Sequence, residues 1–383
     1  IQCWSGTATL TNVDIIGNTS TYHGGLSIQP PVSSFKMTGG SISGNTATSY
    51  NLGSYFGNGG IYINNTRNFV FEGVTISDNI GTISGGLSLV NNVGSSATFK
   101  SCIFSGNAAS GSTSGGGIYQ YANTTLTLED CELSGNSSTG TTSAGGIYSL
   151  GVLNVVGGVT VKNNRGAQAG GIYTKSQLEL LSGEISGNEA TAAVSSGGVY
   201  WTTGSLTVGG SMQIKANKAP LAGGVYVNAG CVLRVAGRAY IQENLNGSNK
   251  ASNVYFANDE MKIEIAGRMS EGAAIGVTRT AISLITTGYG ARNDIEPTQY
   301  FTADSPLSKV VTRGTGLDME AAIMSFDNEI NWSYAVQTSL AEHGATKTVT
   351  LYQDWEARPD ETYTTSFGNT TGYLNGGLYV PVG

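Results

Sequence analysis

Short runs in which apolar and polar residues alternate recur along the first 277 residues, and they predict β-strands. Residues 153–155 (Leu-Asn-Val) place two apolar side chains on one side of a strand and one polar side chain on the other, because side chains of a strand alternate between its faces. Residues 159–161 (Val-Thr-Val) and 178–180 (Leu-Glu-Leu) repeat this pattern. No run with a period of 3.6 residues in this region reaches the ~8–20 residues of an ordinary helix.

Two motifs alternate along the same region. The first consists of two glycines, an aliphatic residue and, in most copies, a tyrosine. Its copies lie at 24–27, 59–62, 85–88, 116–119, 145–148, 170–173, 197–200 and 223–226, with a degenerate copy, Ser-Asn-Val-Tyr, at 252–255. Because glycine carries no Cβ, we expect the pair to permit either a positive φ or the close approach of neighbouring segments.

The second motif is an apolar residue three positions before an asparagine. The asparagines are Asn18, Asn45, Asn79, Asn107, Asn136, Asn164, Asn188, Asn217 and Asn244. Their mean spacing is about 28 residues, which is a repeat length typical of solenoid proteins. Each repeat holds three strand-like runs separated by turns.

Three strands and three turns per repeat predict an all-β fold, a right-handed single-stranded parallel β-helix of about nine coils. Parallel strands lie about 4.8 Å apart, so nine coils would form a rod of roughly 40–45 Å. The apolar residue before each asparagine should point inward. The asparagine lies at a bend, where we expect it to adopt a left-handed conformation and to hydrogen-bond the next coil.

Stacked asparagines would give partners to turn groups that otherwise lack them. The structural residues predicted on this basis are Asn79, Asn107, Asn136, Asn164, Asn188 and Asn217.

Two cysteines share one position of the repeat. Cys102 and Cys131 each lie five residues before a motif asparagine, so they should stack directly, with Cα atoms about 5 Å apart. A disulfide tolerates that separation. The alternative is a pair of buried reduced thiols in a core stack. Cys3 and Cys231 have no evident partner.

The tyrosines of the double-glycine motif are the strongest candidates for binding. Each follows an inward aliphatic residue, so its ring should point outward, and we expect an exposed row. Its members are Tyr119, Tyr148, Tyr173, Tyr200 and Tyr226, with Tyr62 and Tyr255, and Ser27 and Ser88 interrupt it. Flat apolar rings with hydroxyl groups suit a sugar or a protein. Alternatively, the rings only stabilise neighbouring coils.

Composition narrows the classes of partner. Glycine accounts for 56 of 383 residues, charged residues make up 12% and the net charge is −7. No basic run is present, so nucleic acid is a poor partner, and no apolar run reaches the ~20 residues of a membrane span. Without a Cys-x-x-Cys pair and with only two histidines, we predict no metal site and no cofactor. The start, Ile1-Gln2-Cys3, is typical of a mature or trimmed fragment.

The pair of motifs resembles the repeats of chlamydial polymorphic outer-membrane proteins and of adhesin-like β-helix proteins of gut bacteria. Residues 104–107 (Phe-Ser-Gly-Asn) carry the Phe-x-x-Asn form, and other coils have an aliphatic residue in place of Phe. The resemblance covers residues 1 to about 277. It implies a surface-exposed region with an adhesive role, on the extracellular side of a bacterial cell.

The repeat fails in the last third of the chain. We expect domains at 1–277 (β-helix), 278–332 (a β-rich cap or linker) and 333–383 (a short helix plus strands). Residues 333–343 predict the helix, with Ser333 as N-cap and Gly344 as its end. A further double glycine at 376–377 suggests that 333–383 begins a second β-helix module.

An enzyme of the polygalacturonase or pectate lyase kind would need clustered carboxylates or calcium-binding acids with a base. Here acids are scattered, as at Glu72, Asp78 and Glu184, and the local cluster of Glu129, Asp130 and Glu132 fits a solvated surface. We therefore expect no catalysis. We expect an adhesin or scaffold module that contacts a host or neighbouring-cell protein or glycan, or associates with itself, with residues 46–58 and 108–115 as loop contacts. The alternative is a polysaccharide-acting or carbohydrate-binding β-helix.

Overall fold

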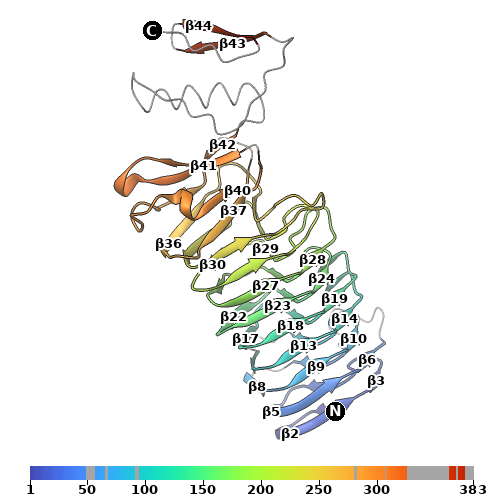
Figure 1. Ribbon diagram of the computed structural model, residues 1–383. Coiled ribbons are helices and arrows are strands. Elements are labelled where there is room, and N and C mark those ends of the chain that lie inside the picture. Colours follow the sequence, from blue (N-terminus) through green and yellow to red (C-terminus); the bar gives the residue numbers. More distant parts are fainter. Residues whose placement is uncertain are drawn as a thin grey trace.

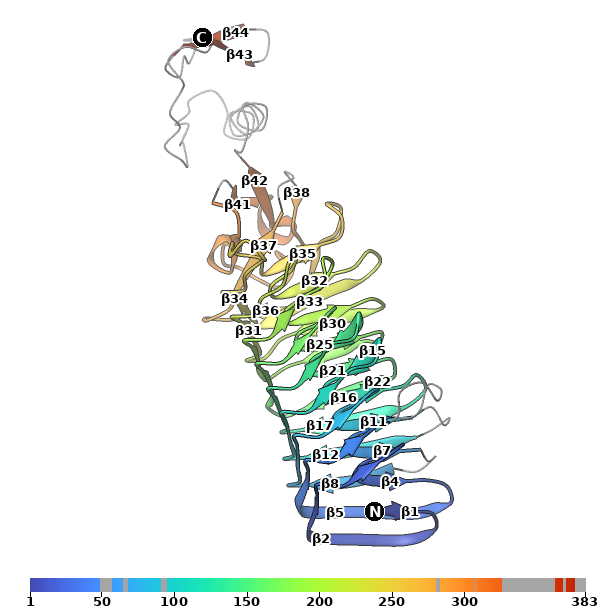
Figure 2. The ribbon, with the colours of Figure 1, turned by 90° about the vertical axis from the view of Figure 1, so that its right-hand side faces the viewer.

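The computed structural model describes residues 1–48, 57–64, 68–90, 95–279, 283–306, 308–325, 362–367 and 370–375. Short parallel strands stack along one axis in a right-handed β-helix of about ten turns. Figures 1 and 2 show the resulting rod, in which the chain rises coil by coil from the N-terminal end. The predicted parallel β-helix is confirmed.

The first face of the coil follows the double glycines. It contains β1 (Gln2–Cys3), β4 (Leu26–Ile28), β7 (Ile61–Ile63), β11 (Leu87–Leu89), β16 (Ile118–Gln120), β21 (Ile147–Ser149), β25 (Ile172–Thr174), β29 (Val199–Trp201), β32 (Val225–Val227) and β35 (Val254–Phe256). Neighbours pair in parallel and in register, so Tyr119 aligns with Tyr148 and Tyr148 with Tyr173.

The second face is the next side of each coil. It contains the first part of β2 (Gly6–Ile16) and of β5 (Val32–Ser43), then β8 (Asn68–Glu72), β12 (Ser96–Lys100), β17 (Thr125–Glu129), β22 (Val152–Val156), β26 (Leu178–Leu180), β30 (Ser205–Val208), β33 (Val232–Gly237), β36 (Ile263–Met269) and β39 (Thr286–Thr287). Its outward positions are mostly polar, as the alternating pattern predicts.

The third face precedes the motif asparagines. It contains the last part of β2 and of β5, then β9 (Thr75–Ser77), β13 (Ile103–Ser105), β18 (Glu132–Ser134), β23 (Val159–Lys162), β27 (Gly183–Ser186), β31 (Gln213–Lys215), β34 (Tyr240–Gln242), β37 (Ala274–Thr278) and β40 (Phe301–Ala303).

A short fourth sheet, absent from the three-strand prediction, follows the asparagines. It contains β3 (Thr19–Ser20), β6 (Thr46–Ala47), β10 (Ile80–Gly81), β14 (Ala108–Ala109), β19 (Ser137–Ser138), β24 (Arg165–Gly166) and β28 (Glu189–Ala190). A separate pair, β15 (Thr113–Gly115) and β20 (Thr142–Ala144), lies just before the double glycines.

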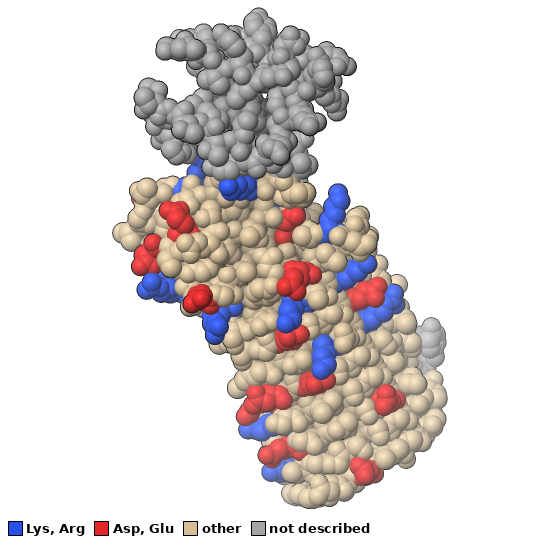
Figure 3. Space-filling model, in the orientation of Figure 1, with Lys and Arg blue, Asp and Glu red and all other residues tan. Residues whose placement is uncertain are grey.

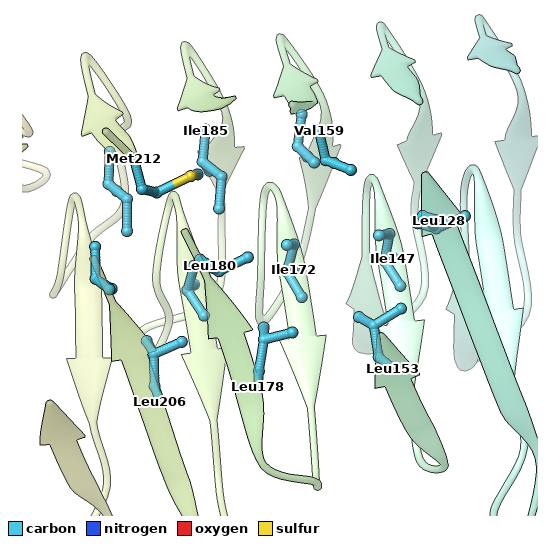
Figure 4. Packing of buried hydrophobic residues seen from close by; sticks show 14 of the residues in the cluster. Leu128, Ile147, Leu153, Val159, Ile172, Leu178, Leu180, Ile185, Leu206 and Met212 are labelled. Carbon is cyan, nitrogen blue, oxygen red and sulfur yellow. The ribbon is translucent and has the colours of Figure 1, made fainter. Parts of the chain in front are cut away.

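One continuous apolar core fills the inside of the coils. Figure 4 shows Leu153, Ile172 and Leu178 among side chains that enter the space between the faces, and all three are buried. Equivalent residues stack along the axis, as with Phe71 and Phe99, whose parallel rings lie 4.5 Å apart between centroids. Each such aliphatic or aromatic side chain contributes about 1.5–3 kcal/mol by leaving water.

The motif asparagines form a hydrogen-bonded ladder through this core, as predicted. The side-chain amide nitrogen of Asn107 donates to Oδ1 of Asn136 at 2.9 Å and to the main-chain oxygen of Ile76 at 2.9 Å. The backbone N–H of Asn107 also donates to Oδ1 of Asn136. The same contacts run from Asn45 to Asn244 through every asparagine of the motif.

The expected left-handed conformation of the asparagine is wrong by one position. It is the preceding residue that has a positive φ, as at Gly106 (63°), Gly135 (64°) and Asn163 (55°). The left-handed residue makes the bend, and the asparagine after it is free to turn its side chain inward, where Asn107 and Asn136 are fully buried. Glycine suits the bend because it has no Cβ.

The double glycines serve close approach, which was one of the two predicted roles. A Cβ on Gly145 would lie 2.3 Å from the backbone nitrogen of Arg165, and one on Gly146 would lie 2.6 Å from the carbonyl oxygen of Gly171. No side chain larger than hydrogen fits against backbone at these distances. The pair therefore lets the first face pass directly beneath the asparagine turn.

Described residues 283–306 and 308–325 cover the C-terminal end of the stack. They contain β38 (Ser283–Leu284), β41 (Ser308–Arg313) and β42 (Glu320–Ser325), which form an antiparallel sheet, and the short 3₁₀ helices η1 (Pro297–Gln299) and η2 (Gly316–Asp318). Ile285, Phe301 and Ile323 from this part are buried in the same core as the coils. An open solenoid end needs such a cover.

Two further strands, β43 (Thr362–Phe367) and β44 (Thr370–Asn375), form an antiparallel pair. The helix predicted at 333–343 lies outside the described residues, as does the double glycine at 376–377. The second-module hypothesis stays a prediction.

Replacing Asn136 by Ala should lower the free energy of unfolding by about 2–4 kcal/mol, because it leaves the buried N–H groups of Asn107 without an acceptor. Urea denaturation followed by circular dichroism measures the change. The control is Asn154→Ala on the exposed side of β22, which should change stability by less than about 0.5 kcal/mol. Equal losses in the two variants would contradict the ladder.

Candidate functional site

The predicted tyrosine row exists as a continuous stack of rings outside the first face. Ring centroids of Tyr148 and Tyr173 lie 4.4 Å apart with planes 2° from parallel. The remaining steps measure 4.9–5.9 Å between centroids, with planes 3–12° from parallel, from Tyr119 to Tyr148, Tyr173 to Tyr200, Tyr200 to Tyr226 and Tyr226 to Tyr255. Sequence therefore placed the rings on the correct side of the strands.

The expected exposure of the row is wrong. Tyr119, Tyr148, Tyr173, Tyr200 and Tyr226 are only 3–8% exposed. They form a second apolar cluster with Ala144, Ala169 and Ala222, residues of the segments that lead into the double glycines. These segments lie over the rings, because each returns from the fourth sheet to the first face. The row is thus a second core and offers no flat surface to a ligand.

Where the row is interrupted at Ser27, another aromatic ring takes the place of tyrosine. The imidazole of His23 stacks on Tyr62 at 3.8 Å between centroids and 14° between planes. Its Nδ1 lies 3.2 Å from the side-chain nitrogen of Asn58, so Asn58 donates to a neutral imidazole. At the other interruption, the Ser88 hydroxyl is buried, and Ile83 packs against the tyrosine cluster.

Burial determines the protonation of these rings. It raises the pKa of Tyr148 far above its usual range and raises the pKa of Tyr200 and Tyr226. It also lowers the pKa of His23 to about 4. At neutral pH His23, Tyr148, Tyr200 and Tyr226 are therefore uncharged, and the raised pKa values of these three tyrosines make their phenols poor proton donors.

Four of the scattered carboxylates form ion pairs with lysines of neighbouring coils. Nitrogen–oxygen distances are 3.4 Å for Lys36–Glu72, 2.8 Å for Lys100–Glu129, 3.1 Å for Lys162–Glu132 and 3.1 Å for Lys215–Glu184. Figure 3 shows acidic and basic side chains interspersed on one side of the rod. Each exposed pair contributes at most about 1 kcal/mol, but together they neutralise the outer faces.

The local acidic cluster at 129–132 has the same character. Burial alone would raise the pKa of Glu132, but hydrogen bonds from Ser134 and Lys162 outweigh it and lower the pKa. Asp130 accepts a hydrogen bond from the backbone N–H of Gly158 at 2.8 Å. Glu184 behaves like Glu132, since hydrogen bonds from Ser186 and Lys215 lower its pKa. With lowered pKa values, Glu132 and Glu184 are ionised at neutral pH and suit pairing better than proton donation.

Asp304 is a partly buried carboxyl group that sequence reasoning missed. It accepts hydrogen bonds from the backbone N–H of Asn253 at 2.6 Å, from the Asn253 side chain at 2.5 Å and from the Thr278 hydroxyl at 2.6 Å. Asn253 in turn accepts from Asn244. Burial raises the pKa of Asp304. The ladder therefore continues beyond the last motif asparagine and ends on a carboxyl group of the cap.

The two stacked cysteines are free thiols, and both are buried. Among the described residues, no group of three or more His, Cys, Asp or Glu side chains is arranged to hold a metal ion. Within the same residues, no helix has the length and apolarity needed to cross a membrane.

Comparison with known proteins agrees with this architecture. Residues 4–164 match the family model described as "Right handed beta helix region". This match supports a β-helix family for the chain. No curated protein and no solved structure matches the chain. The finer resemblance to adhesin-type repeats stays a prediction.

Replacing Tyr173 by Ala should cost about 3–5 kcal/mol of stability, because it opens a cavity in the second core. Tyr173→Phe keeps the ring and should cost about 1 kcal/mol or less. Thermal or urea unfolding measures both changes. If Tyr173→Ala left the stability almost unchanged, the ring would be exposed in solution, as the sequence suggested.

Stability of the first coils should fall as the pH drops from 7 to 5. His23 has a lower pKa in the folded chain than the ordinary 6.5, so the unfolded chain binds protons more readily between about pH 6.5 and 4. The loss at pH 5 should be at most about 2 kcal/mol, less for any screening by solvent. Hydrogen exchange of amides in β4 and β7 measures it.

The pH effect is assigned to one residue by comparing two variants. His23→Gln should abolish the loss between pH 7 and 5, whereas His343→Gln should retain it. An unchanged pH profile in His23→Gln would contradict the assignment.

Proposed function

We propose that this chain is a non-catalytic module of an extracellular bacterial surface protein, a stiff β-helical rod for adhesion or scaffolding. The observation that carries the proposal is that glutamates on the outer faces form ion pairs with lysines. Glu72, Glu129, Glu132 and Glu184 each pair with a lysine of an adjacent coil. Such pairing joins the coils and leaves the faces close to neutral.

Catalysis on polysaccharides would call for a different environment of the acids. A glycoside hydrolase needs one carboxyl group whose pKa is raised, so that it can protonate the leaving oxygen. On the outer faces the pKa of Glu132 and of Glu184 is lowered instead. Asp304 has a raised pKa, but its oxygens are occupied by the end of the ladder. These environments favour a structural role for the acids.

Contacts with a partner must then come from the outer side chains and turns, because the tyrosine stack is covered. On the second face, Val152, Val156 and Leu181 are about half exposed, at 51%, 48% and 51%. Val156 takes the outward position that Glu129 occupies one coil earlier. Exposed apolar side chains on an otherwise polar face are typical of protein contacts. We propose this apolar patch as a contact for a host or neighbouring-cell protein or glycan.

The proposal is tested by separating turnover from binding. Polygalacturonate and neutral plant and host polysaccharides are incubated with the protein, and new reducing ends and absorbance from unsaturated products are measured. We expect neither signal, in the wild type or in Glu132→Gln. Turnover that disappears in Glu132→Gln would replace the adhesive role by an enzymatic one.

Binding is measured with protein-coated beads on epithelial cell monolayers and on a glycan array. We expect wild-type beads to bind, and Val156→Asp with Leu181→Asp to reduce binding roughly tenfold, because both exposed apolar contacts are lost. Thr98→Asp and Thr127→Asp on the same face are the matched control and should bind as the wild type does. Equal binding by both double variants would exclude the patch, and absence of binding to any surface would contradict the adhesive role.

A further inference from the structure

Two buried cysteines, Cys102 and Cys131, lie in neighbouring coils of the core. The inference drawn from them does not depend on the proposed adhesive function. Cys102 and Cys131 directly precede β13 and β18, which pair in register. The backbone N–H of Glu132 donates to the carbonyl oxygen of Cys102 at 3.0 Å. The two cysteines therefore occupy the same position in successive coils, where strands lie about 4.8 Å apart. That separation lies within the Cα range of a disulfide.

The two side chains also point the same way. The Cys102 thiol donates to the carbonyl oxygens of Phe71 at 3.5 Å and Lys100 at 3.3 Å. The Cys131 thiol makes the equivalent contacts with Phe99 at 3.3 Å and Glu129 at 3.4 Å. Because equivalent sulfur atoms sit in equivalent surroundings one coil apart, they stack directly.

The two thiols also influence each other's titration. The neighbouring Cys131 sulfur and burial in the core both raise the pKa of Cys102 in the folded chain. Because the thiolate is the nucleophile in disulfide exchange, the thiols should react before the core encloses them.

We propose that Cys102 and Cys131 are an oxidative cross-linking site, which forms an inter-coil disulfide when the chain folds in the presence of oxidised glutathione. The thiolate of one cysteine attacks one sulfur of glutathione disulfide, forms a mixed disulfide and releases one glutathione thiolate. The thiolate of the other cysteine then attacks the sulfur of the first, forms the protein disulfide and releases the second glutathione. The two thiol protons end on the two reduced glutathione molecules.

Burial dictates when this reaction takes place. Both sulfurs lie in the closed core. Glutathione therefore reaches them only before the coil that contains Cys131 has packed onto the coil that contains Cys102. Oxidation should accompany folding and be slow in the folded protein. Once formed, the disulfide is shielded from reductants by the same core.

The other two cysteines are internal controls. Cys3 aligns with Ile28 of the next coil, and the Cys231 thiol contacts the carbonyl oxygen of Trp201 at 3.9 Å. Neither stacks on a second cysteine, so both should stay reduced in the same experiment.

The test is to refold the full chain from denaturant with a mixture of reduced and oxidised glutathione, and to count free thiols in guanidinium with Ellman's reagent. We expect two thiols per chain, against four after refolding with dithiothreitol. Cleavage after Glu72, Glu129 and Glu132 by a glutamyl endopeptidase separates the cysteines into fragments 73–129 and 130–132. Mass spectrometry should find these fragments joined.

Variants keep the outcome decisive even if one of them folds poorly. The double variant Cys3→Ala/Cys231→Ala should pass from two thiols to none, and Cys102→Ala should keep its three. Amides of β13 and β18 should exchange on the order of a hundredfold more slowly after oxidation, because the cross-link closes a long loop of the unfolded chain. Four thiols after glutathione refolding, or a disulfide that includes Cys3 or Cys231, would overturn the proposal.

Discussion

The side-chain amide of one asparagine per turn sets the geometry on which the rest of the rod depends. Each amide accepts two hydrogen bonds from the asparagine of one neighbouring coil and donates to the asparagine of the other, as Asn136 does between Asn107 and Asn164. A buried amide that loses these partners is costly, so a coil is stable only in one register. That same register also aligns the tyrosine rings, the lysine–glutamate pairs and the two core cysteines.

The repeat made most of this architecture predictable, and its failures have a common physical cause. Alternation along a strand reveals on which side a residue lies, but not what lies over that side. Tyr148 lies outside the first face, as predicted, but it is buried. The alanines that pack with the tyrosines, such as Ala144 and Ala169, lie in segments without an apolar pattern of their own, so the sequence did not reveal this cover. The left-handed bend was misplaced although glycine stands before the asparagine at Gly106 and Gly135, which was the available signal.

Asp304 could not be predicted because it lies 51 residues beyond Asn253, outside any repeat. Its position is nevertheless explained by the ladder. Each asparagine donates its backbone N–H and one side-chain N–H to the asparagine of the next coil, as Asn107 does to Asn136, so the last asparagine presents donors to whatever follows. A carboxyl group accepts these donors better than another amide, because it has no N–H of its own to bring against them. The ladder therefore ends where the cap supplies a carboxyl group in the place of a further amide.

The spacing of the ladder has a last consequence for how such a chain changes in length. Asn164 and Asn188 are 24 residues apart and Asn188 and Asn217 are 29 apart, yet both pairs bond at 2.9 Å. Each turn of the β-helix contributes one amide to the ladder, whatever the number of residues in that turn. Extra residues in a turn therefore extend outward and do not change the distance between coils along the axis. The segments between ladder asparagines can then vary in length and sequence while the pitch of the β-helix stays constant.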